Sequence, residues 1–238
     1  MSGSEGPLAL GVDGARSGWI AVWQTAGTFR YALYGDPAAL CAAHPAASVI
    51  AVDIPIGLSD SLGRAPDALA RRFVGGRRAC SIFSAPVRGI LDAASQPEAS
   101  RRHRAIDGRG FGAQSFAILA KIRVWDELLQ RQPGLRAVVR EVHPEVSFAT
   151  LNGGVGLVES KKKAPGQALR RALLAGHFGQ SAIDDVVRTV PRRQAATDDV
   201  LDALVALWSA GRMLRGEAQS LPAPPMIDAT GLATAIWY

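Results

Sequence analysis

Two apolar segments with the pattern of buried strands each end on an aspartate: Asp13 follows residues 8–12, and Asp53 follows residues 49–52. A carboxylate at the end of a buried strand is costly unless it meets a cation, a hydrogen-bond donor or water. A third acidic group opens the most regular helical pattern near the C-terminus: Asp198, Asp199 and Asp202. Carboxylates that converge from distant parts of a chain are ligands that Mg²⁺ and Mn²⁺ accept. These residues therefore predict a divalent-metal site.

Asp202 is the acid of that helix that is hardest to explain by helix formation alone. Thr197 is expected as the N-cap, and Asp198 and Asp199 suit the positive end of the helix dipole, which accounts for both of them structurally. Asp202 lies a full turn further along, and two negative groups one turn apart repel each other unless a cation lies between them. The two strand-end aspartates have a structural alternative, because either could cap the turn that follows it.

The elements that must position these acids alternate between strand and helix patterns. We expect strands over residues 8–13, 19–23, 28–34, 49–53 and 136–143. We expect helices that begin at Asp36 or cover residues 66–73, 116–129, 168–178 and 198–214. Pro222–Pro225 is expected to end the packed region, and residues 227–238 to form a last edge strand or a closing turn. This order predicts one α/β domain over residues 8–238, with a mixed sheet and helices on its faces.

Composition places the chain among ordinary globular proteins. Its 238 residues are 48% hydrophobic and 20% charged, which is enough for a well-buried core. No apolar run approaches the ~18 residues of a membrane span. The N-terminus lacks the basic-then-apolar pattern of a signal peptide, so we expect a cytoplasmic protein. Cys41 and Cys80 show no spacing that is typical of a zinc site.

The net charge of +6 comes from one segment of the chain. Residues 64–109 hold ten arginines against four acidic residues. This segment is part of a predicted helical insertion over about residues 59–133, after the fourth strand. A basic surface of this kind attracts polyanions, although a solvated helix face is the alternative.

Several of the basic residues are candidates for phosphate contacts. Arg77, Arg78 and Arg88 flank the motif at residues 81–86, which predicts a lip that holds phosphates over the acidic site. Arg16, in the turn after the first strand, is a further candidate. Lys161 belongs to a short basic turn that either contacts a phosphate backbone or is simply solvated.

The motifs that carry the acids resemble those of ribonuclease H-like nucleases. Residues 8–19 resemble the first strand and turn of that superfamily, and Asp53 stands where its middle strand has an acidic residue. Residues 199–204 resemble the closing helix of RuvC-type resolvases, which carries two metal-binding aspartates at this spacing. Five motifs in order are similar to an uncharacterised bacterial and archaeal family, the domain of unknown function numbered 429, described as a predicted nuclease with the RNase H fold: residues 52–57, 81–86, 114–116, 141–145 and 198–203.

This resemblance, which spans residues 8–235, implies an RNase H-like mixed five-stranded sheet flanked by helices, with the insertion after the fourth strand. It implies a nuclease that uses Mg²⁺ or Mn²⁺ to hydrolyse phosphodiester bonds of DNA or RNA. It places the metal ligands at Asp13, Asp53, Asp199 and Asp202. The insertion departs from the resolvase plan, so a four-way junction is not carried over as the substrate.

Residues 141–145 contain acids and a histidine that a resolvase would not need. Glu141 and His143 share one face of the expected strand, where they could add a catalytic ligand and a general acid or base that contacts the substrate. A histidine hydrogen-bonded at a strand end, beside Pro144, is the structural alternative.

Two other functions stay open. The chain could be a binding module that kept the fold, lost the chemistry and contacts nucleic acid or protein through its insertion. It could also be a phosphoryl-transfer enzyme of the actin and sugar-kinase type, to which the Asp13-Gly14 turn has a weak similarity. The absence of an internal repeat and of the common nucleotide loops argues against that second alternative. Mn²⁺ binding would separate a nuclease from a binding module.

Overall fold

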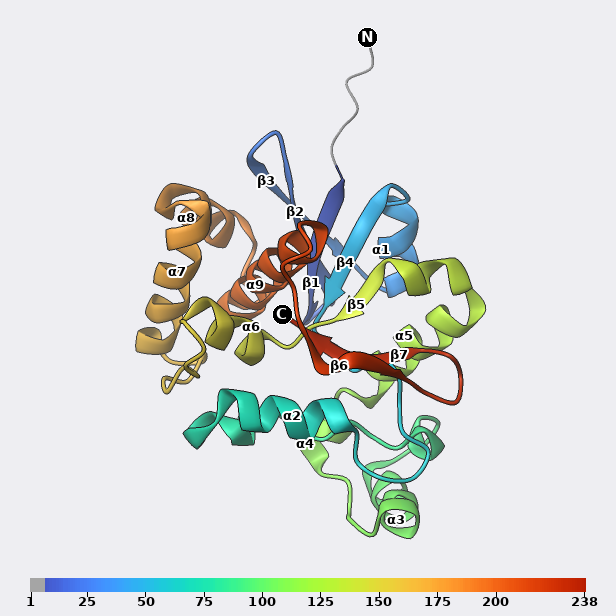
Figure 1. The fold of residues 1–238 in the computed structure, drawn as a ribbon. Coiled ribbons are helices and arrows are strands. Elements are labelled where there is room, and N and C mark those ends of the chain that lie inside the picture. Colours follow the sequence, from blue (N-terminus) through green and yellow to red (C-terminus); the bar gives the residue numbers. More distant parts are fainter. Residues whose placement is uncertain (1–6) are drawn as a thin grey trace.

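A five-stranded mixed sheet forms the centre of the α/β fold in Figure 1, a computed structural model that describes residues 7–238. The strand order is β3-β2-β1-β4-β5, with β1, β2 and β3 antiparallel and β1, β4 and β5 parallel. The bounds are β1 (Leu8–Ala15), β2 (Gly18–Thr25), β3 (Thr28–Tyr34), β4 (Ala47–Val52) and β5 (Val139–Glu141). The predicted mixed sheet is confirmed, and its arrangement is consistent with an RNase H-like fold.

Helices cover both faces of this sheet. One face carries α1 (Pro37–Ala43) and α5 (Leu119–Arg131). The other carries α6 (Pro144–Leu151), α7 (Ala164–Phe178), α8 (Gln180–Thr189) and α9 (Thr197–Leu214). Within residues 7–238, no helix is long and apolar enough to span a bilayer.

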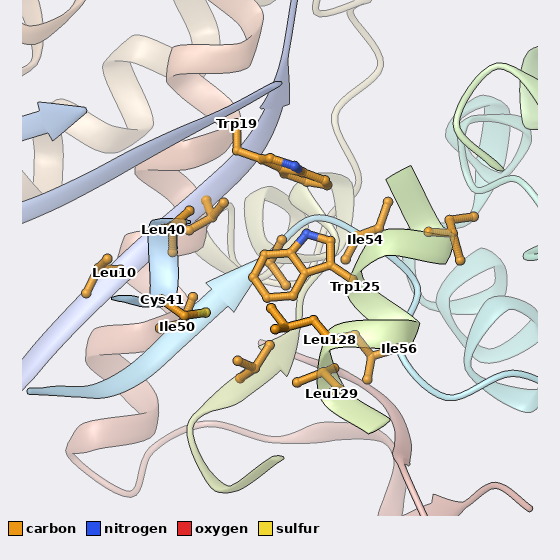
Figure 2. Packing of buried hydrophobic residues seen from close by; sticks show 14 of the residues in the cluster. Leu10, Trp19, Leu40, Cys41, Ile50, Ile54, Ile56, Trp125, Leu128 and Leu129 are labelled. Carbon is orange, nitrogen blue, oxygen red and sulfur yellow. The ribbon is translucent and has the colours of Figure 1, made fainter. Parts of the chain in front are cut away.

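The first core layer, drawn in Figure 2, follows from the alternation of side chains along the strands. On β2, Trp19 and Ala21 point into the layer under α1 and α5, whereas Ile20 and Val22 point toward α7, α8 and α9. Trp19 meets Trp125 of α5 edge to face, with ring centroids 5.6 Å apart. Because α5 supplies this layer, the end of the predicted insertion belongs to the core of the sheet domain.

The second layer brings α9 unusually close to the sheet. A Cβ atom added to Gly11 of β1 would lie 2.1 Å from the carbonyl oxygen of Ala203 and the amide nitrogen of Leu207. Next to it, Ala51 of β4 packs against Ala206 of α9. Small residues on both strands therefore let the helix backbone approach the backbone of the sheet.

The insertion lies at the end of the sheet where β1 and β4 finish (Figure 1). It holds α2 (Ala65–Val74), α3 (Gln96–Asp107), α4 (Ala113–Phe116) and the 3₁₀ helices at Gly76–Ser81 and Arg88–Ile90. A separate two-stranded sheet of β6 (Ser220–Ile227) and β7 (Ala233–Trp237) packs between α2 and β5.

Several predicted elements differ from the structure. The strand expected over residues 136–143 is reduced to Val139–Glu141, because Pro133–Ala137 forms a 3₁₀ helix and His143 caps α6. The helix expected over residues 116–129 is divided between α4 and α5. Pro222–Pro225 does not end the packed region but lies within β6, whose partner β7 replaces the expected edge strand or turn. Helices α3, α6 and α8 were not anticipated.

Candidate functional site

The strand-end aspartates come together because β1 and β4 are parallel and in register. Gly11 pairs with Ala51 and Val12 with Val52, and the Asp53 amide donates to the Val12 carbonyl. The next residues along the two strands are therefore Asp13 and Asp53, side by side at the carboxyl edge of the sheet. Alternation turns both toward the face covered by α9.

Helix α9 delivers its acids to the same edge. Asp202, Ala206 and Ala210 follow one another at four-residue intervals, and both alanines pack in one cluster with Ala51 of β4. Asp199 lies one helical turn before Ala203, and the carbonyl oxygen of Ala203 packs closely against Gly11 of β1. The first turns of α9 therefore project beyond the ends of these strands, where Asp199 and Asp202 reach the strand-end aspartates.

Helix α9 begins differently from the prediction. Its N-cap is Ala196 and not Thr197, and the Asp199 carboxylate accepts a hydrogen bond from the Ala196 amide at 2.8 Å. Asp199 thus stabilises the start of the helix through its own side chain. It is only partly buried, and burial raises its pKa.

The carboxylates perturb one another strongly. Burial, followed by the charges of Asp53 and Asp202, raises the pKa of Asp13 well above its ordinary value. Burial raises the pKa of Asp53, which keeps some solvent exposure, to about 8 despite the opposing charge of Lys161. Burial also raises the pKa of Asp202, which is completely enclosed. Like charges this close disfavour their common ionisation, and a cation would relieve that repulsion.

Lys161 is the cation that the chain itself places among these acids. Its Nζ donates to Oδ2 of Asp202, and Asp13 and Asp53 also raise its pKa. The other Asp202 oxygen, Oδ1, is buried without a hydrogen-bond partner among the described residues. Lys161 was predicted as a phosphate contact, and nothing in the sequence pattern connected it to Asp202.

A second lysine lies beside the site and was not predicted. Lys121 of α5 donates to the carbonyl oxygens of Ala15 and Gly18, at 2.9 and 3.1 Å, in the turn that follows Asp13. Burial lowers its pKa, against the charges of Asp13 and Asp199. The residue stands on the predicted helix 116–129 without any motif that would single it out.

Glu141 and His143 both have structural partners. Glu141 forms a buried ion pair with Arg64 at 2.7 Å, and its other oxygen accepts from the Ile56 amide. His143 lies at the N-cap of α6, where Nδ1 accepts from the Glu145 amide. Burial lowers the pKa of His143 to about 4, so its ring is neutral at physiological pH. The contact of His143 is therefore the structural alternative considered above, a histidine hydrogen-bonded where a strand ends.

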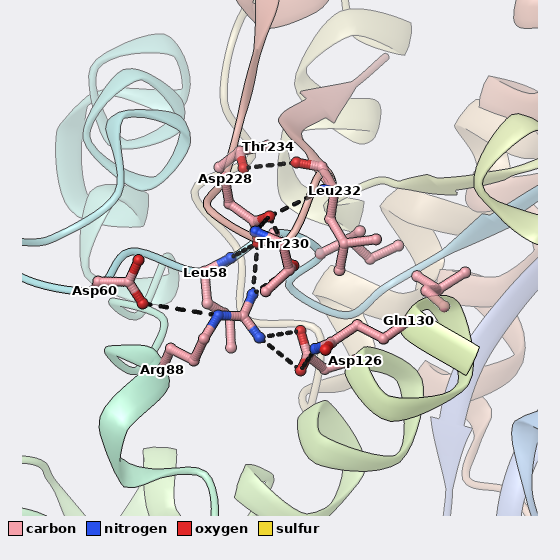
Figure 3. A network of polar contacts seen from close by, with 12 residues as sticks. Leu58, Asp60, Arg88, Asp126, Gln130, Asp228, Thr230, Leu232 and Thr234 are labelled. Carbon is pink, nitrogen blue, oxygen red and sulfur yellow. Dashed lines mark hydrogen bonds and ion pairs between the residues drawn. The ribbon is translucent and has the colours of Figure 1, made fainter. Parts of the chain in front are cut away.

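Two of the three predicted arginines of the insertion, Arg78 and Arg88, lie in ion pairs with acids of the protein. Arg78 contacts Glu145 at 2.5 Å, and the buried Arg170 of α7 binds both oxygens of the same carboxylate. Arg88 bridges Asp126 and Asp228, as Figure 3 shows. The side chain of Arg77 lies outside the described part of the structure.

Arg16, by contrast, is exposed in the turn between β1 and β2, three residues after Asp13. Its exposure leaves it accessible to a phosphate group in solution, although no contact within the described part of the chain joins it to the acidic residues.

The buried network around the site carries an excess of negative charge. Its six carboxylates are those of Asp13, Asp53, Asp67, Glu141, Glu145 and Asp202. Its four cations are Arg64, Arg78, Lys161 and Arg170. Among the described side chains, and with every group ionised, two negative charges remain without a partner. Lys121 and Asp199, at the rim, cancel each other and leave this difference unchanged.

The ligand chemistry fits a hard divalent cation, because carboxylate oxygens are the ligands that Mg²⁺ and Mn²⁺ prefer and Asp202 Oδ1 is unpartnered. The side chains as they lie do not yet form a ligand set. Within residues 7–238, no group of three or more acidic, histidine or cysteine side chains is placed to hold a metal ion. The ammonium group of Lys161 stands against the carboxylate that a metal would need.

Comparison with known families gives one match. The family model described as "Protein of unknown function (DUF429)" matches residues 11–227. No significant match was found among curated proteins or among solved structures. The matched segment contains all four acids of the candidate site and the whole insertion. The chain therefore belongs to this family of proteins of unknown function.

Proposed function

We propose that the protein is a divalent-metal-dependent nuclease that hydrolyses phosphodiester bonds in nucleic acid. The observation that carries this proposal is the pair of uncompensated negative charges in the buried acidic network at the carboxyl edge of β1 and β4. Burying unpaired charge is expensive, so a network of this kind takes up either protons or a cation. One divalent cation would match the excess.

Asp13, Asp53 and Asp202 would hold the metal, and Asp199 would complete the shell. A bound Mg²⁺ or Mn²⁺ would supply activation of a water molecule and stabilisation of charge on the phosphate. Gly11 lets α9 pack directly on β1, which fixes Asp202 relative to Asp13. Arg16, exposed in the turn three residues after Asp13, would bind a phosphate of the substrate backbone.

The proposal is tested with a panel of labelled nucleic acids: single-stranded, duplex and branched DNA, RNA and hybrid. Each is incubated with Mn²⁺ or Mg²⁺ and the wild-type protein or an Asp13→Asn/Asp202→Asn double variant. Asp198→Asn is the matched control, because Asp198 lies one turn before Asp202 on the same helix. We expect metal-dependent cleavage by the wild type and the control, and none by the double variant.

Equal cleavage by the double variant would identify a contaminating nuclease. No cleavage together with no Mn²⁺ binding by the wild type would overturn the proposal. It would favour the alternative of a binding module on the same fold.

A further inference from the structure

Lys161 occupies the place where the proposed function requires a metal ion. Its ammonium group contacts Oδ2 of Asp202 and acts electrostatically on Asp13 and Asp53. It is thus the one ammonium group that the described network directs at all three proposed ligands. A divalent cation would bind the same Asp202 carboxylate group, and two cations on one carboxylate would repel each other. Lys161 and a metal ion therefore exclude each other at Asp202.

The loop around Lys161 is anchored, whereas the side chain of Lys161 is partly exposed to solvent. The turn before α7 is closed by hydrogen bonds to Ser160, from the amides of Lys162 and Lys163. Gly166 packs so closely on this turn that an added Cβ would lie 2.0 Å from the Ser160 carbonyl. About a third of the Lys161 side-chain surface is exposed, at 34%, and its four-carbon stem is flexible. The ammonium can thus leave Asp202 for solvent without displacing the backbone.

The contact with Lys161 gives a hydrogen-bond partner to only one of the two Asp202 oxygens. Lys161 serves Oδ2, whereas Oδ1 is buried without a partner among the described residues. A single positive charge also leaves two of the three proposed ligands without a counter-charge among the described residues. A carboxylate in this state gains more from a divalent cation than from the ammonium, provided that the ammonium can depart.

We propose that Lys161 is an exchangeable internal counter-cation, which holds the acidic site together without metal and is displaced from Asp202 when a divalent cation binds. This inference rests on the proposed metal-dependent function. The affinity of the site for metal would then depend on two competing interactions of the Asp202 carboxylate, one with the metal ion and one with the Lys161 ammonium group. The released ammonium group would then lie at the mouth of a site that receives a phosphate, where its charge favours an anionic substrate.

The test compares Mn²⁺ binding to the full-length wild type with binding to Lys161→Met and Lys161→Gln, after removal of metal with a chelator. Binding is followed by the loss of the free Mn²⁺ spectrum in electron paramagnetic resonance. Lys162→Met is the matched control, since its exposed neighbouring side chain carries the same charge. Asp202→Asn locates the site, because it should lose the binding.

We expect removal of the Lys161 charge to tighten Mn²⁺ binding roughly tenfold, within the range typical of competition between two ligands. Lys162→Met should bind like the wild type. Thermal melting in chelator gives a second readout: both Lys161 variants should melt below the wild type without metal, and Mn²⁺ should raise their melting temperature more. This readout applies even if one of the variants is partly unfolded without metal.

Unchanged or weaker Mn²⁺ binding by both Lys161 variants would overturn the exchange while leaving the metal site in place. Binding by the variants but not by the wild type would also overturn the exchange, because Lys161 would then block the site permanently and would not be displaced. If neither the wild type nor the variants bind Mn²⁺, the proposed function fails and the inference fails with it.

Discussion

Replacing Asp53 by asparagine should make the metal-free protein more stable at neutral and alkaline pH. Most substitutions of buried groups destabilise, so a gain would be distinctive. The pKa of the Asp53 carboxyl is raised from 3.8 to about 8, first by burial. A carboxyl group with a higher pKa in the folded state than in the unfolded state binds more protons when folded, between the two pKa values. Metal-free stability should therefore fall as the pH rises through this window.

The magnitude follows from the size of the pKa shift. Each pKa unit corresponds to 1.36 kcal/mol, so the full shift would cost ~5 kcal/mol of folding free energy near pH 8. Asp53 is partly exposed, and water entering the site would reduce this value. We therefore expect Asp53→Asn to stabilise the metal-free protein by roughly 2 kcal/mol near pH 8 and to have almost no effect near pH 4.

The assay is urea unfolding in the presence of chelator, at about pH 5 and at about pH 8. Asp92→Asn is the control, because this carboxylate is 76% exposed and pairs only at the surface with Arg102. At the higher pH, saturating Mn²⁺ should make the wild type more stable than Asp53→Asn, since the metal stabilises the wild type and not the variant. The reasoning is refuted if wild-type stability in chelator rises between the two pH values, or if Asp53→Asn is no more stable than the wild type at the higher one.

Four further substitutions test other parts of the structure. Glu141→Gln removes one of the two carboxylates that pair with the buried Arg64 and leaves it only Asp67. The substitution should lower the free energy of unfolding in urea by about 3 kcal/mol while Mn²⁺ affinity is kept, and lost affinity would instead make Glu141 a ligand. Arg88→Ala removes the cation that pairs with Asp126 and Asp228, so it should lower the free energy of unfolding by about 2 kcal/mol and make the insertion easier for proteases to cut. Arg102→Ala, which breaks an exposed ion pair, should lower the free energy of unfolding by less than about 1 kcal/mol. Equal losses for Arg88→Ala and Arg102→Ala would contradict the expected difference between a buried and an exposed pair. Gly11→Ala should cost at least about 3 kcal/mol, because its Cβ would enter α9, so an unchanged urea midpoint would argue against that close approach.

The parts of the fold that the sequence predicted well are those where local pattern and burial coincide. The strand Thr28–Tyr34 and the helix after Asp36, whose side chain caps it at Ala39, agree with the structure. Asp13 and Asp53 could be singled out because an acid at the end of an apolar run is locally anomalous. Thr197 was misassigned because Asp199 supplies the capping oxygen from within the helix.

The pairing of charges could not be predicted, because it joins residues far apart in the chain. Nothing near Lys161 indicates that it meets Asp202, 41 residues later, and nothing near Arg64 points to Glu141, 77 residues later. Arginine-rich composition therefore suggested a phosphate-binding surface, whereas Arg78 and Arg88 lie against acids of the same chain. The composition of a segment gives its total charge, whereas only the tertiary structure shows which charged side chains are left unpaired and can bind a partner.

The bridge between Arg88 and Asp228 has a consequence for the order in which the protein is completed. These two residues are 140 positions apart, and Asp228 also accepts from the amide of Leu58 at the start of the insertion. During synthesis, every strand of the main sheet is available before the hairpin that fastens the insertion. The contacts of Arg64 and Arg78 with residues of β5 and α6 can form earlier, so the hairpin adds the last of these ties. A newly made chain would pass through a stage in which the main sheet is complete and the insertion is still held by only part of its final contacts.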